Sequence, residues 1–497
     1  MTYRSTLLMG LSLIVVVFTI GIYSANSETK KMPWSDTVQL VLDETKPLEF
    51  DRGSRLPLYL WPAIGPGKLD DAQAEELVRL LNERGVGLIS SGSHGRMEEN
   101  LAECLPVARA QKKLGLRVNI NANALIYSFC DGSEETAHID SEGKPFFDDT
   151  FGPKTMGCPF RLEHRIGPIR ERFERFVEAY QREGLPVDFV FTDWEIDGPL
   201  EWNRAHEASK RCKVCCENLP EIDDFLAYQQ ELRRIRSRLQ RLAYAEPILE
   251  RFPNAIVGNY AVYPHNGWRY WYDYFERYVE GQPALVDQKA RYRHWANDFE
   301  DTKFTFAMPV VYPWSWMWNW YDFESGDYRW VYNGLLVASN AGLHTPNEIP
   351  IIPFVHWHTV DVGVSVNEGP APDSAEKAEQ MSEWAYQELL WHMLLRGSDT
   401  FFLWCTKEEN AKEVQLLHPV WAAAQEYGEF LDKGTPINFE VPSKPGPVVS
   451  GLRLGNKVLV WRTDLTDEKP PVQIKVGGKV LKIPVVAGQC QVLSIGD

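Results

Sequence analysis

Long apolar runs are almost absent from this sequence of 497 residues. The exception is Leu7–Tyr23, which follows Arg4 and precedes the small polar residues Ser24, Ala25 and Ser27. A basic residue, an apolar segment and then small polar residues are typical of a secretory signal, but about 17 apolar residues are also near the lower limit for a membrane anchor. We therefore expect residues 1–27 to be a signal peptide or an N-terminal membrane attachment. The folded part is then exported, to the periplasm or the extracellular space.

An excess of basic residues is also lacking. Lys and Arg number 52 against 69 Asp and Glu, which leaves a formal net charge of −17. Binding to phosphate requires clustered Lys and Arg, so nucleic acid is not the expected partner. The same balance argues against a polyanionic substrate. A hydrophobic share of 44% and a charged share of 24% are those of an ordinary globular protein with a sizeable core.

Cysteine is too scarce for a disulfide scaffold, since there are only eight. An exported chain nevertheless permits disulfides. The segment Cys212–Cys216 holds one closely spaced pair, whereas a structural zinc site needs four ligands and usually two such pairs. We therefore expect a local disulfide there rather than a metal. Together with Cys130 and Cys158 in the loop before it, such bridges would stiffen a substrate-binding rim, although sequence does not give the pairing.

Eight short apolar segments with strand character alternate with helix-like patterns, and no Gly-rich phosphate loop follows the first of them. This order predicts an α/β fold, a (β/α)8 TIM barrel, rather than a doubly wound open sheet. The expected strands are Leu56–Trp61, Val86–Ser91, Arg117–Asn121, Phe189–Asp193, Ala255–Asn259, Thr305–Val311, Ile351–Val355 and Thr400–Trp404.

The chain then divides into parts around this barrel. Residues 28–55 form an N-terminal extension, residues 56–435 the barrel, and residues 436–497 a small β-sandwich-like domain. Within the last part, turns such as Gly477-Gly478 separate four short segments of strand character.

Catalytic groups of such barrels lie at the carboxyl ends of the strands. The fourth expected strand emerges there into Asp193-Trp194-Glu195. Residues i and i+2 of a strand share a face, so both carboxylates point the same way. Two neighbouring carboxylates split their pKa values, which lets one act as a general acid while the other stays ionised. We expect Asp193 and Glu195 to be the catalytic residues of a glycoside hydrolase.

A second carboxylate across the sugar is missing from the ends of the later strands. Most glycosidases need one, but in a substrate-assisted mechanism the 2-acetamido oxygen of the sugar is the nucleophile. Glu195 would then be the general acid and base, and Asp193 would orient the acetamide of a glycan that contains N-acetylhexosamine. Two alternatives stay open. One is a conventional mechanism with Asp322, Glu324 or Asp361 as nucleophile, and the other is a barrel that binds glycan without cleaving it.

The Asp193-Trp194-Glu195 motif resembles that of the hyaluronidase family and, more loosely, of chitinase-like Asp-x-Glu glycosidases. The resemblance implies that Glu195 is the acid and Asp193 the acetamide partner. It is limited to the motif and the general order of strands, and Ile196–Pro199 departs from the hyaluronidase pattern. We therefore do not expect hyaluronan to be the substrate.

Aromatic residues are abundant, with 18 Trp, 20 Tyr and 23 Phe. Aromatic rings in general can pack on the apolar faces of sugars, and Tyr and Trp also have a polar group that can form a hydrogen bond. His356 and His358 share a strand face and would suit a metal pair, but the first strand lacks the matching ligands, so we expect no metal or cofactor. From the ends of the strands we expect an oligo- or polysaccharide to contact Tyr59, Trp61, Asn121, Asn259, Tyr260, Tyr312, Trp314, His356, His358 and Trp404.

Overall fold

The structure is a computed structural model that describes residues 32–65, 67–92, 95–148, 156–194, 203–259, 296–313, 326–360, 379–442 and 444–495. The expected signal or anchor lies outside these residues. Within the described ranges, no helix combines the length and the apolar character needed to cross a membrane. The chain from Trp34 to Asp497 forms one compact unit.

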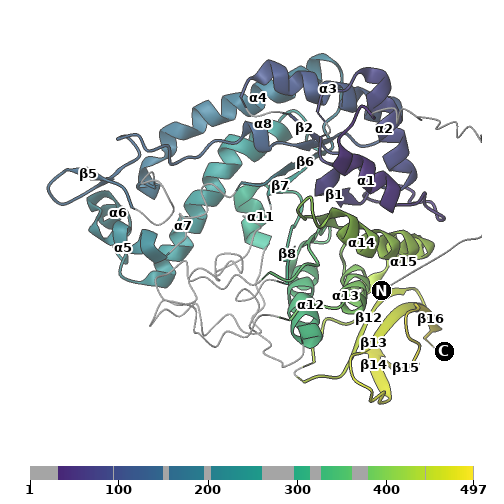
Figure 1. The fold of residues 1–497 in the computed structure, drawn as a ribbon. Coiled ribbons are helices and arrows are strands. Elements are labelled where there is room, and N and C mark those ends of the chain that lie inside the picture. The colour runs from purple at the N-terminus through teal and green to yellow at the C-terminus, as the bar shows by residue number, and fades with distance from the viewer. Residues whose placement is uncertain are drawn as a thin grey trace, which may run out of the picture. The chain divides into compact units, whose positions relative to one another are not determined.

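Parallel strands and helices alternate through most of this unit (Figure 1). The parallel strands are β1 (Tyr59–Leu60), β2 (Ser90–Ser91), β3 (Asn119–Asn121), β6 (Phe189–Thr192), β7 (Ile256–Asn259), β8 (Val310–Val311), β9 (Phe354–Val355) and β10 (Phe402–Leu403). The helices are α1 (Asp36–Glu44), α2 (Asp71–Glu83), α3 (Met97–Lys113), α4 (Ile166–Arg182), α5 (Asn203–Arg211), α6 (Lys213–Asn218), α7 (Phe225–Gln240), α8 (Glu246–Leu249), α11 (Ala296–Thr302), α12 (Gly326–His344), α13 (Glu383–Leu394), α14 (Asn410–Ala424) and α15 (Gly428–Lys433).

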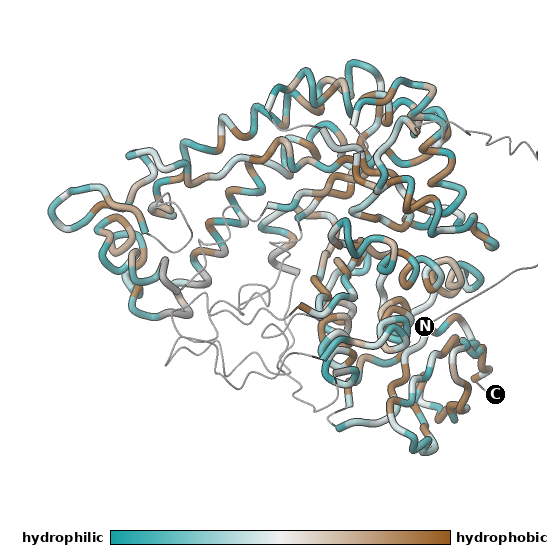
Figure 2. The backbone as a smooth tube through the Cα atoms, viewed as in Figure 1, coloured by the Kyte–Doolittle hydropathy of each residue, from teal (hydrophilic) through white to brown (hydrophobic). Residues whose placement is uncertain are grey.

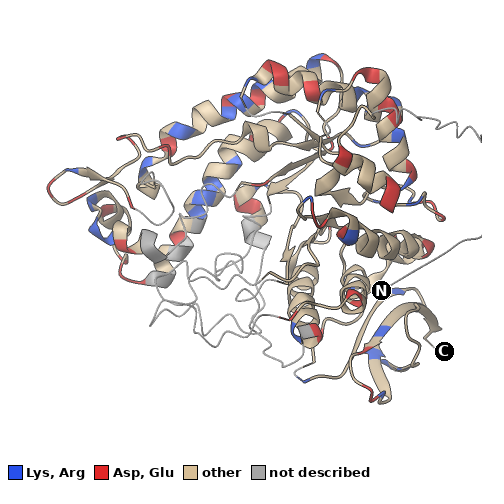
Figure 3. Cartoon of the chain, viewed as in Figure 1, with Lys and Arg blue, Asp and Glu red and all other residues tan. Residues whose placement is uncertain are grey.

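Helix α2 illustrates how the sequence specifies these elements. Asp70 accepts a hydrogen bond from the Gln73 backbone N–H, and the Gln73 side chain accepts one from the Asp70 N–H in return, which forms a capping box. The apolar stripe predicted from the 3.6-residue period is buried at Ala74, Leu77 and Leu81. Charged residues lie on the outer sides of helices such as α2, α3 and α4 (Figure 3). Figure 2 shows the hydrophobic segments along the central strands.

Each predicted parallel strand is present, but its regular pairing is shorter than expected. At the first strand, pairing ends at Leu60 because a 3-10 turn begins at Trp61. Pro62 follows in that turn and has no N–H to donate to a ladder. Similar truncation at the other strands leaves single bridges such as Ala307↔Ile351 outside the regular ladders.

The strands pair in two four-stranded parallel sheets, in the orders β2-β3-β6-β7 and β1-β10-β9-β8. An isolated parallel bridge, Leu58↔Val86, links the edge strands at one side. At the other side the Thr305 N–H donates to the Val257 carbonyl at 2.9 Å. Neighbours therefore follow the order expected of a barrel. Continuous pairing, however, is confined to the two sheets, and closure stays a prediction.

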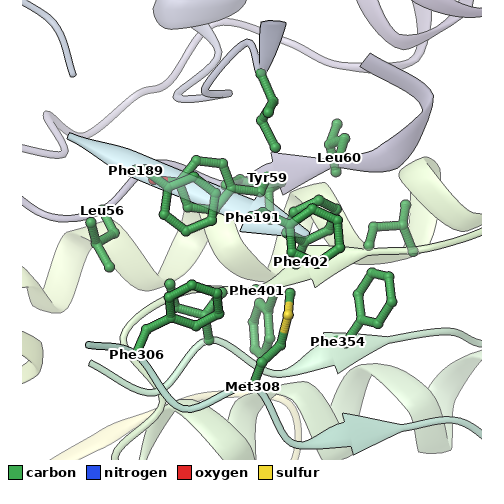
Figure 4. Packing of buried hydrophobic residues seen from close by; sticks show 14 of the residues in the cluster. Leu56, Tyr59, Leu60, Phe189, Phe191, Phe306, Met308, Phe354, Phe401 and Phe402 are labelled. Atoms are coloured by element: carbon green, nitrogen blue, oxygen red, sulfur yellow. The ribbon is translucent and has the colours of Figure 1, made fainter. Parts of the chain in front are cut away.

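Large rings from both sheets form the core between them (Figure 4). Tyr59 stacks on Phe189 with ring centroids 4.3 Å apart, and Phe191 lies 4.7 Å from Phe402. Phe189 and Phe191 are two residues apart in β6, so both point to the interior. This alternation decides which side chains near the end of β6 also face inward.

The C-terminal part is all-β, as predicted, and adds two strands that sequence reasoning missed. An antiparallel sheet contains β11 (Thr435–Pro436), β12 (Pro447–Leu454), β13 (Lys457–Asp464) and β16 (Gln491–Ser494), and β14 (Val472–Val476) pairs with β15 (Lys479–Ile483). Gly477 and Gly478 form the turn of that hairpin with φ of 58° and 83°, values that favour glycine. Buried His392 of α13 joins this sheet to the helices through Ser450 and Thr463, each 2.8 Å from a ring nitrogen.

Candidate active site

Asp193, the predicted acetamide partner, directly follows the last residue of β6. Trp194, the next residue, is fully buried on the outer side of the strand. It stacks on Phe129 at 5.3 Å and also contacts Phe173 of helix α4. Because successive side chains alternate, Asp193 continues the inward column of Phe189 and Phe191. The structure therefore places Asp193 at the carboxyl end of a parallel strand, on the interior face.

Amide side chains from β7 and from the 3-10 turn after β3 hold the backbone at this position. Asn123 Oδ1 accepts a hydrogen bond from the Asp193 N–H at 2.6 Å, and Asn259 Oδ1 accepts one from the Trp194 N–H at 3.1 Å. The Asn259 amide also donates to the Trp194 carbonyl at 3.4 Å. Arg236 of helix α7 donates to the same carbonyl at 3.2 Å. This segment is thus fixed by side chains from three elements.

Two of the predicted sugar-binding residues, Asn259 and Asn121, instead bond backbone groups at the ends of the strands. Asn259 is 1% exposed and its side chain is occupied with Trp194. Asn121 is 5% exposed, and its Oδ1 accepts the Asn123 N–H at 3.0 Å, which supports the 3-10 turn at Asn123–Leu125. The prediction that they bind substrate is corrected: each satisfies backbone groups at the strand ends. Asn123, which sequence reasoning missed, lies just two residues beyond the expected third strand.

Tyr59 is also corrected. It is fully buried in the core, and its hydroxyl lies 3.4 Å from Asn119 Oδ1. Burial raises the pKa of Tyr59 above its ordinary value. The physical reason for the error is that β1 continues to Leu60, one residue beyond Tyr59. Tyr59 therefore lies one layer deeper in the core than the end of the strand. Trp61, two residues on, is partly exposed and meets Phe191 edge-on at 5.9 Å.

Aromatic side chains from β8, β9 and β10 gather beyond this core layer. The Tyr312 ring lies 5.7 Å from both His356 and Trp404, and His356 lies 5.1 Å from Trp404. Tyr312 and His356 are almost completely buried, whereas Trp404 is partly exposed. Of these three predicted residues, only Trp404 keeps part of its ring exposed, and Tyr312 and His356 pack against that ring.

The two histidines are each matched with a carboxylate of helix α14 or the turn before it. His356 Nδ1 lies 3.0 Å from Oε1 of the fully buried Glu413, and exposed His358 lies 3.2 Å from Glu409. Glu413 also accepts the backbone N–H groups of Trp357 and His358, each at 2.9 Å for the shorter contact. Glu413 thereby fixes the segment after β9. Its role was not visible in the sequence, because it comes from a helix far along the chain.

Several predicted residues lie outside the part of the chain that the structure describes. They are Glu195, Tyr260, Trp314 and the alternative nucleophiles Asp322, Glu324 and Asp361. Their roles stay predictions.

The expected disulfides are wrong. No disulfide joins any of the eight cysteines, all of which lie among the described residues. The sulfur atoms of Cys158 and Cys215 are 3.5 Å apart, well beyond the roughly 2.05 Å of a disulfide.

A pocket of about 460 Å³ lies at the opposite, amino ends of the strands. Arg52, Arg117, Asn119 and Asp188 are among its lining residues. In barrel enzymes this end contributes to stability, and the chemistry lies at the carboxyl ends. We therefore assign the pocket no part in the site around Asp193.

No protein-family model matches the sequence, and no curated protein matches it. Among solved structures, a GH36 α-galactosidase from Geobacillus stearothermophilus is similar with a TM-score of 0.43 and 11% identity, over 92% of this chain and 57% of that one. This chain therefore spans little more than half the length of that enzyme. A GH27 β-L-arabinopyranosidase from the same organism gives 0.39 and 11% over 85% and 86%. An α-L-fucosidase from Paenibacillus thiaminolyticus gives 0.35 and 11% over 88% and 86%. Similarities this weak do not establish a shared activity.

Proposed function

We propose that this chain is an exported glycoside hydrolase whose two parallel sheets form the wall of a (β/α)8 barrel. The observation that carries the proposal is the position of Asp193. It lies on the interior face at the carboxyl end of β6, with its own N–H held by Asn123 and the next N–H held by Asn259. Carboxylates fixed at this end of a parallel strand are where barrel enzymes carry their chemistry.

The surroundings of Asp193 support a sugar as the ligand. Trp61 and Trp404 present partly exposed rings above a closed aromatic core, and Tyr312 packs behind Trp404. Sugars offer apolar C–H faces to such rings and hydroxyl groups to the polar edges. Trp61 lies against Phe191, two residues before Asp193, and a carboxylate at the end of this strand suits a reaction in which positive charge develops on the sugar.

The proposed mechanism is retaining and assisted by the substrate. Glu195 donates a proton to the leaving oxygen while the acetamide oxygen of an N-acetylhexosamine attacks the anomeric carbon. Asp193 orients the acetamide and stabilises the positive charge that develops on it. Water then opens the cyclic intermediate, and Glu195 takes up the proton of that water. The fixed backbone at Asp193 keeps this carboxylate in place during both steps.

Glu195→Gln and Asp193→Asn, assayed on a panel of glycans with and without N-acetylhexosamine, test the proposal. We expect either change to lower kcat by at least 10²-fold, in the range of a lost general acid. Asp188→Asn is the matched control. Asp188 lies just before β6 at its amino end, where it accepts the Val118 N–H at 2.8 Å, so activity is retained. Wild-type turnover by Glu195→Gln would show that Glu195 is not the acid.

A substrate without the acetamide separates the two enzymatic alternatives. Substrate assistance requires that group, so we expect turnover of an otherwise identical glucoside to be lost. Equal turnover of both substrates would point to a second carboxylate of the protein as nucleophile. Tight binding of glycans without any product would favour a barrel that only binds.

A further inference from the structure

Four metal-ligating side chains meet away from Asp193. They are His138, Cys158, Cys212 and Cys215, all buried, and their ligand atoms lie within 4.8 Å of one another. The sulfur of Cys215 is 3.5 Å from that of Cys158 and 3.7 Å from His138 Nδ1. No other group of three or more such side chains lies this close together among the described residues.

These distances match the edges of a metal tetrahedron. Bonds of about 2.3 Å to sulfur and about 2.0 Å to nitrogen give edges of roughly 3.8 Å between two sulfurs and roughly 3.5 Å between sulfur and nitrogen. A disulfide would require a sulfur separation of about 2.05 Å instead. We propose that His138, Cys158, Cys212 and Cys215 bind a structural zinc ion. The sequence alone did not assemble this set, because His138 and Cys158 are distant in sequence from the Cys212–Cys215 pair.

The surroundings are those of a metal site. His138 Nε2, on the far side of the ring from the cluster, lies 3.8 Å from a carboxylate oxygen of buried Asp148. A carboxylate there is the usual partner that orients a metal-bound histidine. The Ile139 N–H donates to the Cys212 sulfur at 3.4 Å, as suits a sulfur that carries negative charge. At Gly157, beside Cys158, a Cβ would come within 1.9 Å of the Thr136 carbonyl, so only glycine lets this segment approach so closely.

The chemical type of the site follows from its ligands. Three cysteines and one histidine fill all four positions of tetrahedral zinc and leave none for water, which is the arrangement of a structural site. Binding converts the three thiols into thiolates and releases three protons to solvent, while His138 binds as the neutral imidazole. The site is therefore expected to stabilise the fold and to take no part in the hydrolysis.

A structural metal is physically reasonable here because the local hydrophobic core is small. The cysteines Cys158, Cys212 and Cys215 belong to a cluster separate from the main core, together with Leu219, Ile222, Tyr228 and Leu232. Figure 1 shows β5 (Pro145–Phe146), α5 and α6 of this region away from the parallel strands. Small cores of this kind usually need a metal or a disulfide to hold them together.

The zinc would also tie together two segments that border the active site. His138 and Cys158 lie between β3 and α4, and Cys212 and Cys215 lie between β6 and α7. β3 and β6 are neighbours in one sheet, and both segments leave from their carboxyl ends. Asp193 stands at the start of the second segment. This zinc inference does not depend on the proposed hydrolase activity.

Metal analysis of the purified full-length protein tests the site. We expect about one zinc per chain after dialysis against a weak chelator, and at least a tenfold loss of zinc in Cys215→Ser. Cys216→Ser is the matched control, because Cys216 is adjacent but exposed and is not among the four. Full zinc content is expected there. Zinc that stays at the wild-type level in Cys215→Ser would overturn the assignment, as would wild-type protein that holds no zinc.

Measurements on wild-type protein keep the proposal testable if Cys215→Ser fails to fold. A mercurial reagent that modifies thiols should release one zinc ion as three thiols react. Removal of the metal should then speed proteolysis within residues 122–165 and 203–224. Peptide mapping that finds Cys158 or Cys212 in a disulfide with Cys215 would refute the zinc site.

Discussion

Asn259→Ala removes the side chain that holds the backbone next to Asp193, and it tests whether that framework matters. In the wild type the Asn259 amide accepts the Trp194 N–H at 3.1 Å and donates to the Trp194 carbonyl at 3.4 Å. Asn259 is 1% exposed and Trp194 is fully buried, so water does not readily replace the lost contacts. The change isolates a positioning residue, because Asn259 itself need not touch the substrate.

The magnitude follows from the groups left without their bond. A buried N–H that loses its acceptor destabilises a protein by about 1–3 kcal/mol. Arg236 still donates to the Trp194 carbonyl at 3.2 Å, so that group contributes little. A small cavity adds to the loss. We therefore expect the free energy of unfolding to fall by about 2–3 kcal/mol.

Unfolding in urea, followed by tryptophan fluorescence, measures this change. If the proposed function is correct, kcat should also fall by about 10²-fold with little change in KM, because a displacement near 1 Å at a catalytic group has that effect. Asn218→Ala is the control, since the exposed Asn218 side chain bonds only a local helix carbonyl at 2.8 Å. An unfolding free energy within about 0.5 kcal/mol of wild type would refute the view that Asn259 fixes this segment.

Three further predictions concern the packing around the strands. Glu413→Gln should lower the free energy of unfolding by about 2–4 kcal/mol, because buried Glu413 accepts two backbone N–H groups and contacts His356. The control Glu409→Gln should change the free energy of unfolding by less than about 1 kcal/mol. Urea unfolding measures both variants. Trp194→Ala should destabilise by about 3–5 kcal/mol through the cavity beside Phe129, measured in the same way, and a loss below about 1 kcal/mol would contradict the packing described. Burial and then the charge of Arg396 hold the pKa of His392 well below 6.5. The unfolded chain therefore binds a proton that the folded chain does not, and stability present above pH 6.5 is lost as the pH falls below it. His392→Asn should remove up to about 1.4 kcal/mol per pH unit from that slope, seen by comparing unfolding at pH 5 and pH 7.

Local sequence patterns predicted much of the fold. The apolar spacing over Asp70–Arg84 predicts a helix whose ends lie within one residue of those of α2. The same spacing predicts a helix over Ile166–Arg182, and α4 has those bounds. Such signals lie within a few residues of one another, so they survive without knowledge of the rest of the chain. Helix α1 was missed; it packs against α14 and accepts a bond from Asn410 at the Thr37 carbonyl, at 3.2 Å.

The candidate site was predictable only in part. Asp193 stood out because an apolar strand runs into it, and the alternation of side chains gave its inward direction. The depth of a residue in the core did not follow from its sequence position. Asn259 lies at the end of β7 and Tyr59 one residue before the end of β1, yet both are buried, since the layers above them decide what stays exposed.

The sequence by itself determined the alternation of strands and helices, the acid at the end of β6 and the all-β C-terminal part, because each rests on periodicity and short-range chemistry. Only the tertiary structure decided which groups meet. It brought His138 and Cys158 to the Cys212–Cys215 pair and Glu413 to the segment after β9. The reason is that ligand geometry depends on distances in space, and the chain between these residues can be of almost any length without changing them.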